Sequence, residues 1–256
     1  MHRYALIRRP GRSFAEGITS AGLGAPDLDL ALQQHAAYAQ ALRDCGLEVI
    51  VLEADERFPD GCFVEDTAVA LPEIIVIAQP GAESRRGEPE AVAAALSAYR
   101  HLVYLRDRDP AARLDGGDVL RIGQRIYAGL SARTNEAGVA ALAAIAGPLG
   151  YTVSGVPVRD ILHLKTGITH AGNRLLVGTE AFCRLPAFQN FEKIETPPDE
   201  TYAANVLLVN ERLIVPAGYP SVTQSLTARG RAPSAALSMS EFEKMDGGLT
   251  CLSILF

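Results

Sequence analysis

The sequence predicts an α/β protein in which short strands alternate with helices. Most of the expected strands are rich in Val, Ile and Leu and end at Gly or Pro, which is typical of strands: RYALIRRPG, LEVIVLE, EIIVIAQPG, VLRIGQRIYAG, NRLLVG, NVLLVNERLIVPAG and TCLSILF. Helical periodicity appears between them, at residues 30–46, 88–100 and 135–147. The first helix ends at Gly46, the second has Pro89 in its first turn, and the third carries Val139, Leu142 and Ile145 at helical spacing.

A weak internal repeat adds to this pattern. Residues 125–129 (RIYAG) are echoed at 174–178 (RLLVG) and again at 212–218 (RLIVPAG). Each echo follows a strand and a polar turn and precedes a helical segment. A radial array of small sheet-and-helix modules would show such a recurrence, although a doubly wound sheet gives a similar rhythm. No low-complexity linker divides the chain, so we expect a single domain over residues 1–256.

Composition excludes several function classes. The chain has 256 residues, of which 48% are hydrophobic and 21% charged, as in ordinary globular proteins. Its net charge of −6 and lack of a basic run disfavour nucleic acid as a partner. No segment has the length and hydrophobicity of a signal peptide or a membrane span, so we expect a cytoplasmic protein without a membrane partner. Whether it is a monomer or a homodimer stays open.

The four cysteines form no C-x-x-C pair, which makes a zinc knuckle or a redox dithiol a poor interpretation. Cys251 stands apart from the other three because it follows the Gly247-Gly248 pair and precedes the last apolar run. It is either a small buried hydrophobic residue, as free cysteines commonly are, or a nucleophile in a pocket.

Three stretches offer partners for a nucleophile. RFPDGCFVEDTAV carries Asp60, Glu65 and Asp66. If residues 62–69 form a strand, Asp66 shares a face with apolar neighbours and needs a cationic partner; otherwise these carboxylates are solvated at a strand end. In RLDGGDVLR, Asp115 and Asp118 flank two glycines. A hairpin tip is the default there, but Asp66 and Asp115 together suit a planar guanidinium, which carboxylates bind in a bidentate manner.

The third stretch is RDILHLKTGITHAG. Read as a strand, it turns His163 and Lys165 away from the face that carries Leu162 and Leu164. His163 is then a candidate acid–base residue, with His170 as a nearby competitor, although a lone histidine is more often structural or exposed.

Seven motifs occur in order along the chain: FPDGCFVEDTAV, PGAESRRGE, LDGGDVL, GLSARTNEAG, LHLKTG, YAAN and SEFEKMDGGLTC. With them the whole chain closely resembles the dimethylarginine dimethylaminohydrolases, whose superfamily also holds arginine deiminases and amidinotransferases. The resemblance implies a five-bladed α/β propeller of ββαβ modules. It also implies hydrolysis of asymmetric dimethylarginine and monomethylarginine to citrulline and dimethylamine or methylamine.

The resemblance assigns roles residue by residue. Cys251 resembles the nucleophile, which would form an S-alkylthiouronium intermediate, and His163 resembles the general acid and base. Asp66 and Asp115 match the carboxylates that hold the guanidinium, although some relatives have Glu in place of Asp115. The substrate-binding positions implied are Ile18, Asp60, Glu65, Asp66, Arg85, Arg133 and Met245. In that set the arginines hold the α-carboxylate, Asp60 lies near the α-amine, and Ile18 and Met245 act through backbone groups.

Several alternatives remain at this point. A deiminase would act on arginine and release ammonia, but it would have an acidic residue where this chain has Lys165. A catalytically inactive member would only bind arginine-like ligands. Cys251 and His163 are too few ligands for a structural zinc site, so zinc bound there would be an adventitious inhibitor. The chemistry that the resemblance implies needs no metal and no organic cofactor. The small, glycine-rich residues 17–27 have the composition of a lid over an active site.

Overall fold

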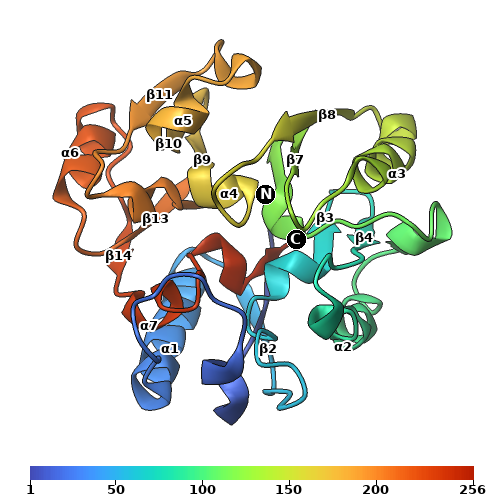
Figure 1. Cartoon of the computed structure of the whole chain (residues 1–256). Coiled ribbons are helices and arrows are strands. Elements are labelled where there is room, and N and C mark those ends of the chain that lie inside the picture. Colours follow the sequence, from blue (N-terminus) through green and yellow to red (C-terminus); the bar gives the residue numbers. More distant parts are fainter.

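A computed structural model describes all 256 residues. The chain forms five three-stranded sheets that surround a common centre (Figure 1). In each sheet the middle strand pairs antiparallel with one neighbour and parallel with the other. An antiparallel hairpin followed by a helix and a parallel strand is a ββαβ module. The predicted five-bladed α/β propeller is therefore confirmed.

Four blades are continuous in the chain. The second contains β3 (Ala68–Ala70), β4 (Ile75–Ile77), α2 (Glu88–Leu96) and β5 (Leu102–Tyr104). The third contains β6 (Val119–Ile122), β7 (Arg125–Leu130), α3 (Glu136–Ala146) and β8 (Thr152–Pro157). The fourth contains β9 (Ile168–Gly172), β10 (Leu175–Gly178), the short α5 (Glu180–Cys183) and β11 (Glu192–Glu195). The fifth contains β12 (Leu207–Val209), β13 (Arg212–Pro216), α6 (Pro220–Ala228) and β14 (Ala235–Leu237).

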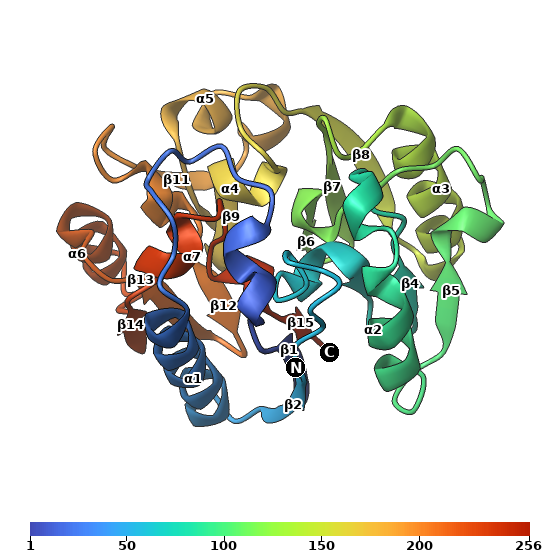
Figure 2. The ribbon, with the colours of Figure 1, turned by 60° about the horizontal axis from the view of Figure 1, so that its bottom comes forward.

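The first blade joins the two ends of the chain. It begins with β1 (Tyr4–Arg8), α1 (Leu28–Asp44) and β2 (Glu48–Leu52), and its missing strand is β15 (Ile254–Leu255) from the C-terminus. β15 pairs antiparallel with β1, so the last strand closes the ring and both termini lie in one sheet (Figure 2). The three echoes of the sequence repeat fall on β7, β10 and β13, which are the equivalent middle strands of three blades.

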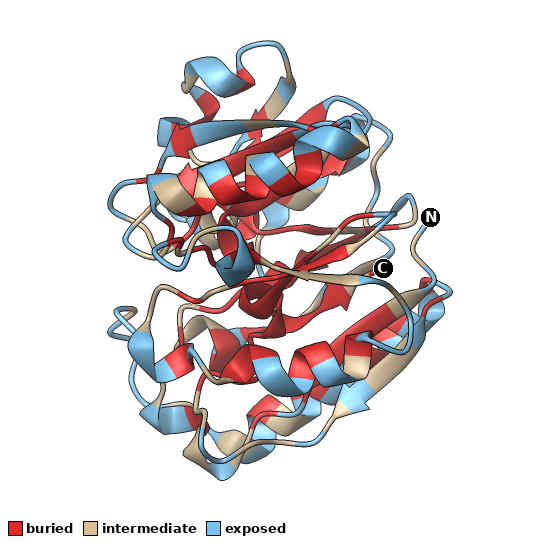
Figure 3. Ribbon diagram, turned by 90° about the vertical axis from the view of Figure 1, so that its right-hand side faces the viewer, coloured by how far each residue is buried: buried red, intermediate tan, exposed pale blue.

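The hydrophobic core is divided among the junctions between blades. Figure 3 shows buried residues along the central strands and along one face of the helices. Five buried clusters each combine residues of two neighbouring sheets, and together they run around the ring from the first blade back to the fifth. One sheet of this size cannot bury its faces alone, so each blade depends on its neighbours for stability. The largest cluster joins α1, β1 and β12, where the ring closes.

Helix α1 shows how the sequence sets one of these boundaries. The side chain of Asp27 accepts a hydrogen bond from the backbone N–H of Leu30 at 3.0 Å and caps the start of the helix. Gly46 follows the helix with φ of +87°, a left-handed conformation that glycine adopts without strain. The buried face includes His35, Ala39 and Leu42, which recur at the three- to four-residue spacing of one helix face.

Two stretches that could be read as strands are not strands, and the last predicted strand begins later than expected, at Ile254. Residues 62–69 are not a strand but contain the 3-10 turn Val64–Thr67 before β3. His163 precedes the one-turn helix α4 (Leu164–Gly167), and Cys251 lies in the 3-10 turn Thr250–Leu252. The predicted hairpin tip of the DGGD stretch is likewise a 3-10 turn, Gly116–Asp118. Tight turns replace strands here because these side chains and backbone N–H groups bond across blades, which regular pairing would prevent. No helix of the chain is long and apolar enough to span a membrane.

Candidate active site

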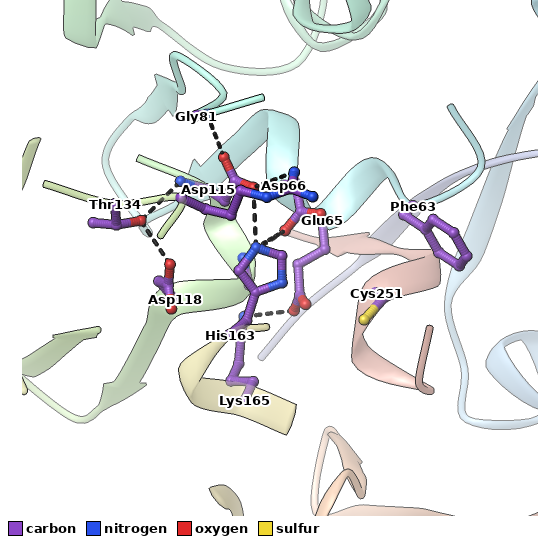
Figure 4. Close-up of polar contacts among 12 residues, drawn as sticks. Phe63, Glu65, Asp66, Gly81, Asp115, Asp118, Thr134, His163, Lys165 and Cys251 are labelled. Atoms are coloured by element: carbon purple, nitrogen blue, oxygen red, sulfur yellow. Dashed lines mark hydrogen bonds and ion pairs between the residues drawn. The ribbon is translucent and has the colours of Figure 1, made fainter. Parts of the chain in front are cut away.

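His163 lies where the third and fourth blades meet, and only 3% of it is exposed. Its Nε2 is 3.0 Å from Oδ2 of Asp115 and 3.8 Å from Oδ1 of Asp66 (Figure 4). Gly117 permits this approach, because a Cβ at that position would come within 2.8 Å of Nδ1 of His163. The structure therefore brings His163 to both predicted carboxylates.

The charges at this cluster favour a protonated imidazole. Burial alone would lower the pKa of His163, but the charge of Asp66 and the hydrogen bond with Asp115 outweigh it and raise that pKa to about 9. The opposite holds for Asp66, where burial raises the pKa but the charges of His163 and Arg85 bring it below its ordinary value. At neutral pH His163 is thus a cation with a proton to donate.

Both carboxylates also accept hydrogen bonds from the backbone. Oδ1 of Asp66 accepts from the N–H of Gly117 at 2.9 Å, and Oδ1 of Asp115 accepts from the N–H of Gly81 at 2.8 Å. Asp115 is completely buried behind His163, so in this state it contacts the imidazole rather than the cavity. These bonds fix the two carboxylates in place.

Arg85 is held entirely by protein groups. Its Nη1 donates to Oδ2 of Asp66 at 2.6 Å, and its Nε and Nη2 donate to Glu88 at 3.0 and 2.8 Å. Nη2 also donates to the carbonyls of Asp60 and Phe63. Arg85 reaches the cavity wall, but most of its hydrogen-bonding capacity is already used.

Arg133 differs from Arg85 in this respect. Its Nη1 is buried and has no hydrogen-bond partner. The same atom forms an ion pair with Oδ2 of Asp115, but at 3.7 Å, which is beyond hydrogen-bond distance. A buried donor that lacks an acceptor is costly. Because Arg133 lines the same cavity as His163, it has the capacity to receive an anionic group there.

Cys251 faces the cavity from the 3-10 turn before β15. Its Sγ accepts a hydrogen bond from the N–H of Gly248 at 3.3 Å. Gly247 has no room for a side chain, since a Cβ would come within 2.2 Å of the ring of Phe63. Burial, followed by the charges of Glu65 and Asp66, raises the pKa of Cys251 to about 12, so the resting sulfur is a thiol.

The segment predicted to be a lid is fastened over this cavity. The N–H of Ile18 donates to both carboxylate oxygens of Asp60 at 3.0 and 3.2 Å. The hydroxyl of Thr19 donates to the carbonyl of Lys244, and the N–H and hydroxyl of Ser20 donate to Oδ2 of Asp246 at 2.5 and 2.9 Å. The enclosed cavity measures about 20 Å³, enough for one water molecule. A cavity of this size does not hold an amino acid.

Glu65 and Lys165 face a different space. The Nζ of Lys165 lies 2.5 Å from Oε1 of Glu65, whose Oε2 accepts from the hydroxyl of Thr250 at 2.8 Å. All three line a separate cavity of about 350 Å³, which His170 on β9 also lines. The cavity beside Cys251 therefore contains neither Lys165 nor His170.

The structure brings most predicted site residues to one cavity: Ile18, Asp60, Asp66, Arg85, Arg133, His163, Met245 and Cys251. Glu65 is on the side of the other cavity, and Asp115 lies behind His163. Sequence reasoning missed four further lining residues: Phe63, Leu162, Asp246 and Gly247. It also missed Glu88, although the spacing of Arg85 and Glu88 by three residues is a signal for an ion pair.

Three residues at this site lie close enough together to be metal ligands. Single ligand atoms of Asp66, Asp115 and His163 lie within 4.8 Å of one another. However, the carboxylates already accept from Arg85 and backbone N–H groups, and Arg133 adds a second cation beside them. This charge balance opposes a bound metal cation.

Comparison with known proteins agrees with the geometry. The family model described as "N,N dimethylarginine dimethylhydrolase, eukaryotic" matches residues 27–215. The N(G),N(G)-dimethylarginine dimethylaminohydrolase of Pseudomonas aeruginosa is 40% identical over 256 residues, which cover 100% of both chains. The chain belongs to the dimethylarginine dimethylaminohydrolase family. The prediction that it is an enzyme of this family is thereby confirmed.

A further relative and two solved structures extend the comparison. The Streptomyces coelicolor enzyme of the same name is 39% identical and matches 98% of this chain and 95% of its own. A structure of the Pseudomonas aeruginosa protein, a Cys-to-Ser mutant complexed with citrulline, superposes with a TM-score of 0.96 at 38% identity over both whole chains. The N-terminal domain of a cyanobacterial arginine dihydrolase has a TM-score of 0.86 at 18% identity, covers 98% of this chain and 97% of its own, and shares the fold.

Proposed function

We propose that this protein hydrolyses Nω-methylated arginines, namely asymmetric dimethylarginine and monomethylarginine, to citrulline and dimethylamine or methylamine. The observation that carries the proposal is the cavity that joins a cysteine, a protonated histidine, the Asp66 carboxylate and the unpaired Nη1 of Arg133. A cationic guanidinium at one end of the substrate and a carboxylate at the other complement these groups. Citrulline bound to a mutant of a relative 38% identical supports the same ligand class.

The chemistry proceeds in two halves. Sγ of Cys251 bonds to the guanidinium carbon, and the bond from that carbon to the methylated nitrogen breaks as His163 protonates the departing amine. The thiol proton is released to solvent when Cys251 ionises, so His163 is left as a neutral imidazole once the amine has departed. The thiouronium on Cys251 is then attacked by water, which gives one proton to His163 and restores the imidazolium. The C–S bond breaks, the second proton of the attacking water passes to the sulfur, and the products are citrulline and the thiol.

Ionisation of Cys251 is the step that needs explanation, because its pKa lies at about 12. The acidic groups that raise this pKa are Glu65 and Asp66, after burial itself. A bound guanidinium brings a positive charge into a cavity of low dielectric constant, and an opposite charge within a few ångströms favours the thiolate. The substrate therefore activates its own nucleophile.

Position 165 supports methylated arginine over arginine. Lys165 pairs with Glu65 and lines the other cavity, while Leu162 lines the cavity that holds Cys251. Position 165 thus adds no carboxylate to the cavity that holds Cys251, and Leu162 gives that cavity an apolar surface. Unmethylated arginine would leave N–H donors unpaired at about 1–3 kcal/mol each, whereas a buried methyl group gains about 0.8 kcal/mol.

The decisive experiment identifies the amine released from asymmetric dimethylarginine, symmetric dimethylarginine and arginine by the purified protein. We expect dimethylamine from the first and at most slow release from the other two. Cys251→Ser is the matched control, since a hydroxyl has nearly the same size but is a far weaker nucleophile. Ammonia released from arginine with a comparable kcat/KM would identify a deiminase instead. Activity of Cys251→Ser within tenfold of the wild type would exclude Cys251 as the nucleophile.

The four free thiols, all buried, support a cytoplasmic location for the enzyme. Methylated arginine is the proposed small-molecule partner, and the proposal needs neither a metal nor an organic cofactor. It is the same for a monomer and for a homodimer, because every residue it uses comes from one chain.

A further inference from the structure

Asp118 has no role in the chemistry above, although it stands in the same DGGD stretch as Asp115. It is completely buried, and its two oxygens accept three hydrogen bonds from two segments, the loop at residues 131–134 and the start of α4. Oδ1 accepts from the N–H of Leu164 at 2.9 Å, and Oδ2 accepts from the hydroxyls of Ser131 and Thr134 at 2.6 and 2.7 Å. Figure 4 shows the contact between Asp118 and Thr134.

The first of these bonds fixes the backbone that carries His163. Leu164 follows His163 directly and opens α4, a helix of four residues, and its N–H lies at the unpaired N-terminal end. A carboxylate that accepts from this N–H holds the peptide between His163 and Leu164. The contact requires Gly129, because a Cβ on β7 at that position would come within 2.5 Å of Oδ1.

The other two bonds extend to Asp115 and Arg133. Oγ1 of Thr134, which donates to Asp118, accepts from the backbone N–H of Asp115 at 3.1 Å. Oγ of Ser131 accepts from the backbone N–H of Arg133 at 3.0 Å. Asp118 is thus connected by one hydrogen bond to the peptide that follows His163, and by two hydrogen bonds each to the backbone of Asp115 and of Arg133.

We infer that Asp118 is a positioning residue, which holds His163 and Asp115 in register so that their hydrogen bond survives each catalytic cycle. The inference rests on the proposed function for its kinetic consequence, but the geometry stands without it. His163 moves between donor and acceptor roles during the reaction, and a loose imidazole would lose its alignment with both Asp115 and the cavity.

Charge adds to the effect of geometry. Asp66, Asp115 and Asp118 all raise the pKa of His163, and the cationic residues that face the cluster are Arg85 and Arg133. Removing the charge of Asp118 while keeping its shape should therefore lower the pKa of His163. A residue with a merely structural role, far from this charge, would leave that pKa unchanged.

Asp118→Asn tests the inference. The amide oxygen can still accept from Leu164, and its NH₂ group can donate to Ser131 and Thr134 if both hydroxyls reverse their roles, so the fold should persist. We expect kcat/KM to fall on the order of tenfold to a hundredfold, as when other histidine-orienting partners are removed. The imidazole of His163, followed by NMR in a Cys251→Ser background, should titrate at lower pH.

Thr134→Ser and Thr134→Val are the matched controls. Serine keeps the hydroxyl between Asp118 and Asp115 and should retain most of the wild-type kcat/KM, whereas valine keeps the shape without the hydroxyl and should lose part of it. Neither should shift the titration of His163 as far as Asp118→Asn does, because the charge of Asp118 stays.

Two results would overturn the inference: unchanged kcat/KM in Asp118→Asn, or a loss explained by a smaller folded fraction with an unmoved His163 titration. The proposed function fails separately, if the wild-type protein releases no dimethylamine. The NMR titration does not depend on turnover, so the two failures are distinguishable.

Discussion

Asp66 and Arg85 form a buried ion pair at 2.6 Å, with less than a tenth of either side chain exposed. The pair changes what the two residues can do. Oδ1 of Asp66 accepts from the N–H of Gly117 and lies 3.8 Å from Nε2 of His163, while Oδ2 accepts from Arg85. Arg85 in turn is bound to Glu88 as well. A buried pair of this kind loses far more when one partner is removed than a surface pair would.

We predict that Arg85→Ala and Arg133→Ala fail in different ways. Arg85→Ala leaves Asp66 and Glu88 buried without their cation, which should cost about 3–5 kcal/mol of unfolding free energy and reduce kcat. Arg133→Ala should leave the melting temperature almost unchanged and raise KM, with a loss of about 1.5–3 kcal/mol, or roughly tenfold to a hundredfold in kcat/KM. Thermal unfolding and steady-state kinetics of both variants provide the comparison.

A substrate without an α-carboxylate separates the roles further. If Arg133 holds that group, Arg133→Ala should lower kcat/KM for dimethylarginine but not for decarboxylated dimethylarginine. The comparison of two enzymes with two substrates is a double-mutant cycle. If Arg85 holds the carboxylate after a rearrangement on binding, the same insensitivity would appear in Arg85→Ala instead. Equal wild-type kcat/KM for both substrates would show that neither arginine holds the carboxylate.

The pH dependence follows from the raised pKa values of His163 and Cys251, about 9 and about 12. The resting enzyme is thiol and imidazolium, and the reactive form, thiolate and imidazolium, has one proton fewer. In the free enzyme the first proton is lost near pH 9, so kcat/KM should rise about tenfold per pH unit below pH 9 and level off above it. Measured profiles that fall between pH 7 and 9 would contradict this assignment.

In contrast, kcat should become independent of pH already at a lower pH than kcat/KM does. It reports the complex, in which the bound guanidinium lowers the pKa of Cys251. Coincident breaks in kcat and kcat/KM would show that the substrate does not assist ionisation. The comparison needs only initial rates at saturating and subsaturating asymmetric dimethylarginine.

The same idea predicts which electrophile labels Cys251. At pH 7, 2-chloroacetamidine is a cation and 2-chloroacetamide is its neutral counterpart, so only the first can stabilise the thiolate. We expect the amidine to modify Cys251 at least tenfold faster, with the mass increase confined to that residue. His163→Gln should slow labelling less than it slows turnover, because no amine has to leave. Equal rates for the two reagents would indicate that the thiol ionises without help from a cation.

The segment fastened by Ser20 and Asp246 should control access to the cavity. Asp246→Gly removes the acceptor of both Ser20 bonds, and glycine tolerates the φ of +56° at this position. Amide hydrogen exchange at residues 17–22 should become faster, while exchange in α1 stays the same. Ser20→Ala loses only the hydroxyl bond, so its exchange rate at residues 17–22 should lie between those of the wild type and Asp246→Gly. Unchanged exchange at residues 17–22 would mean that Ile18 and Thr19 hold the segment without Asp246.

Much of the fold could be predicted from the sequence. Strand signals located β1, β2, β4, β7, β10 and β13, and the echoes at 125, 174 and 212 marked equivalent strands, because hydrophobic periodicity and turn residues act locally. The motifs led to a family whose fold and site residues could be carried over. Cys251, His163 and Asp66 are among the residues that the motifs indicate, and they line one cavity.

The sequence could not predict the conformation of the segments that carry those residues. Residues 62–69 and 161–165 read as strands because their hydrophobicity alternates, yet they form tight turns in which Asp66 accepts from Gly117 and Asp118 accepts from Leu164. Those partners lie 51 and 46 residues away in the chain, so no local pattern records them. Likewise, only the packing of the blades decides that Arg85 is bound by Asp66 while Nη1 of Arg133 has no partner. Local propensity determines the blades, whereas the buried polar contacts between blades, which exist only after the ring has closed, determine the site.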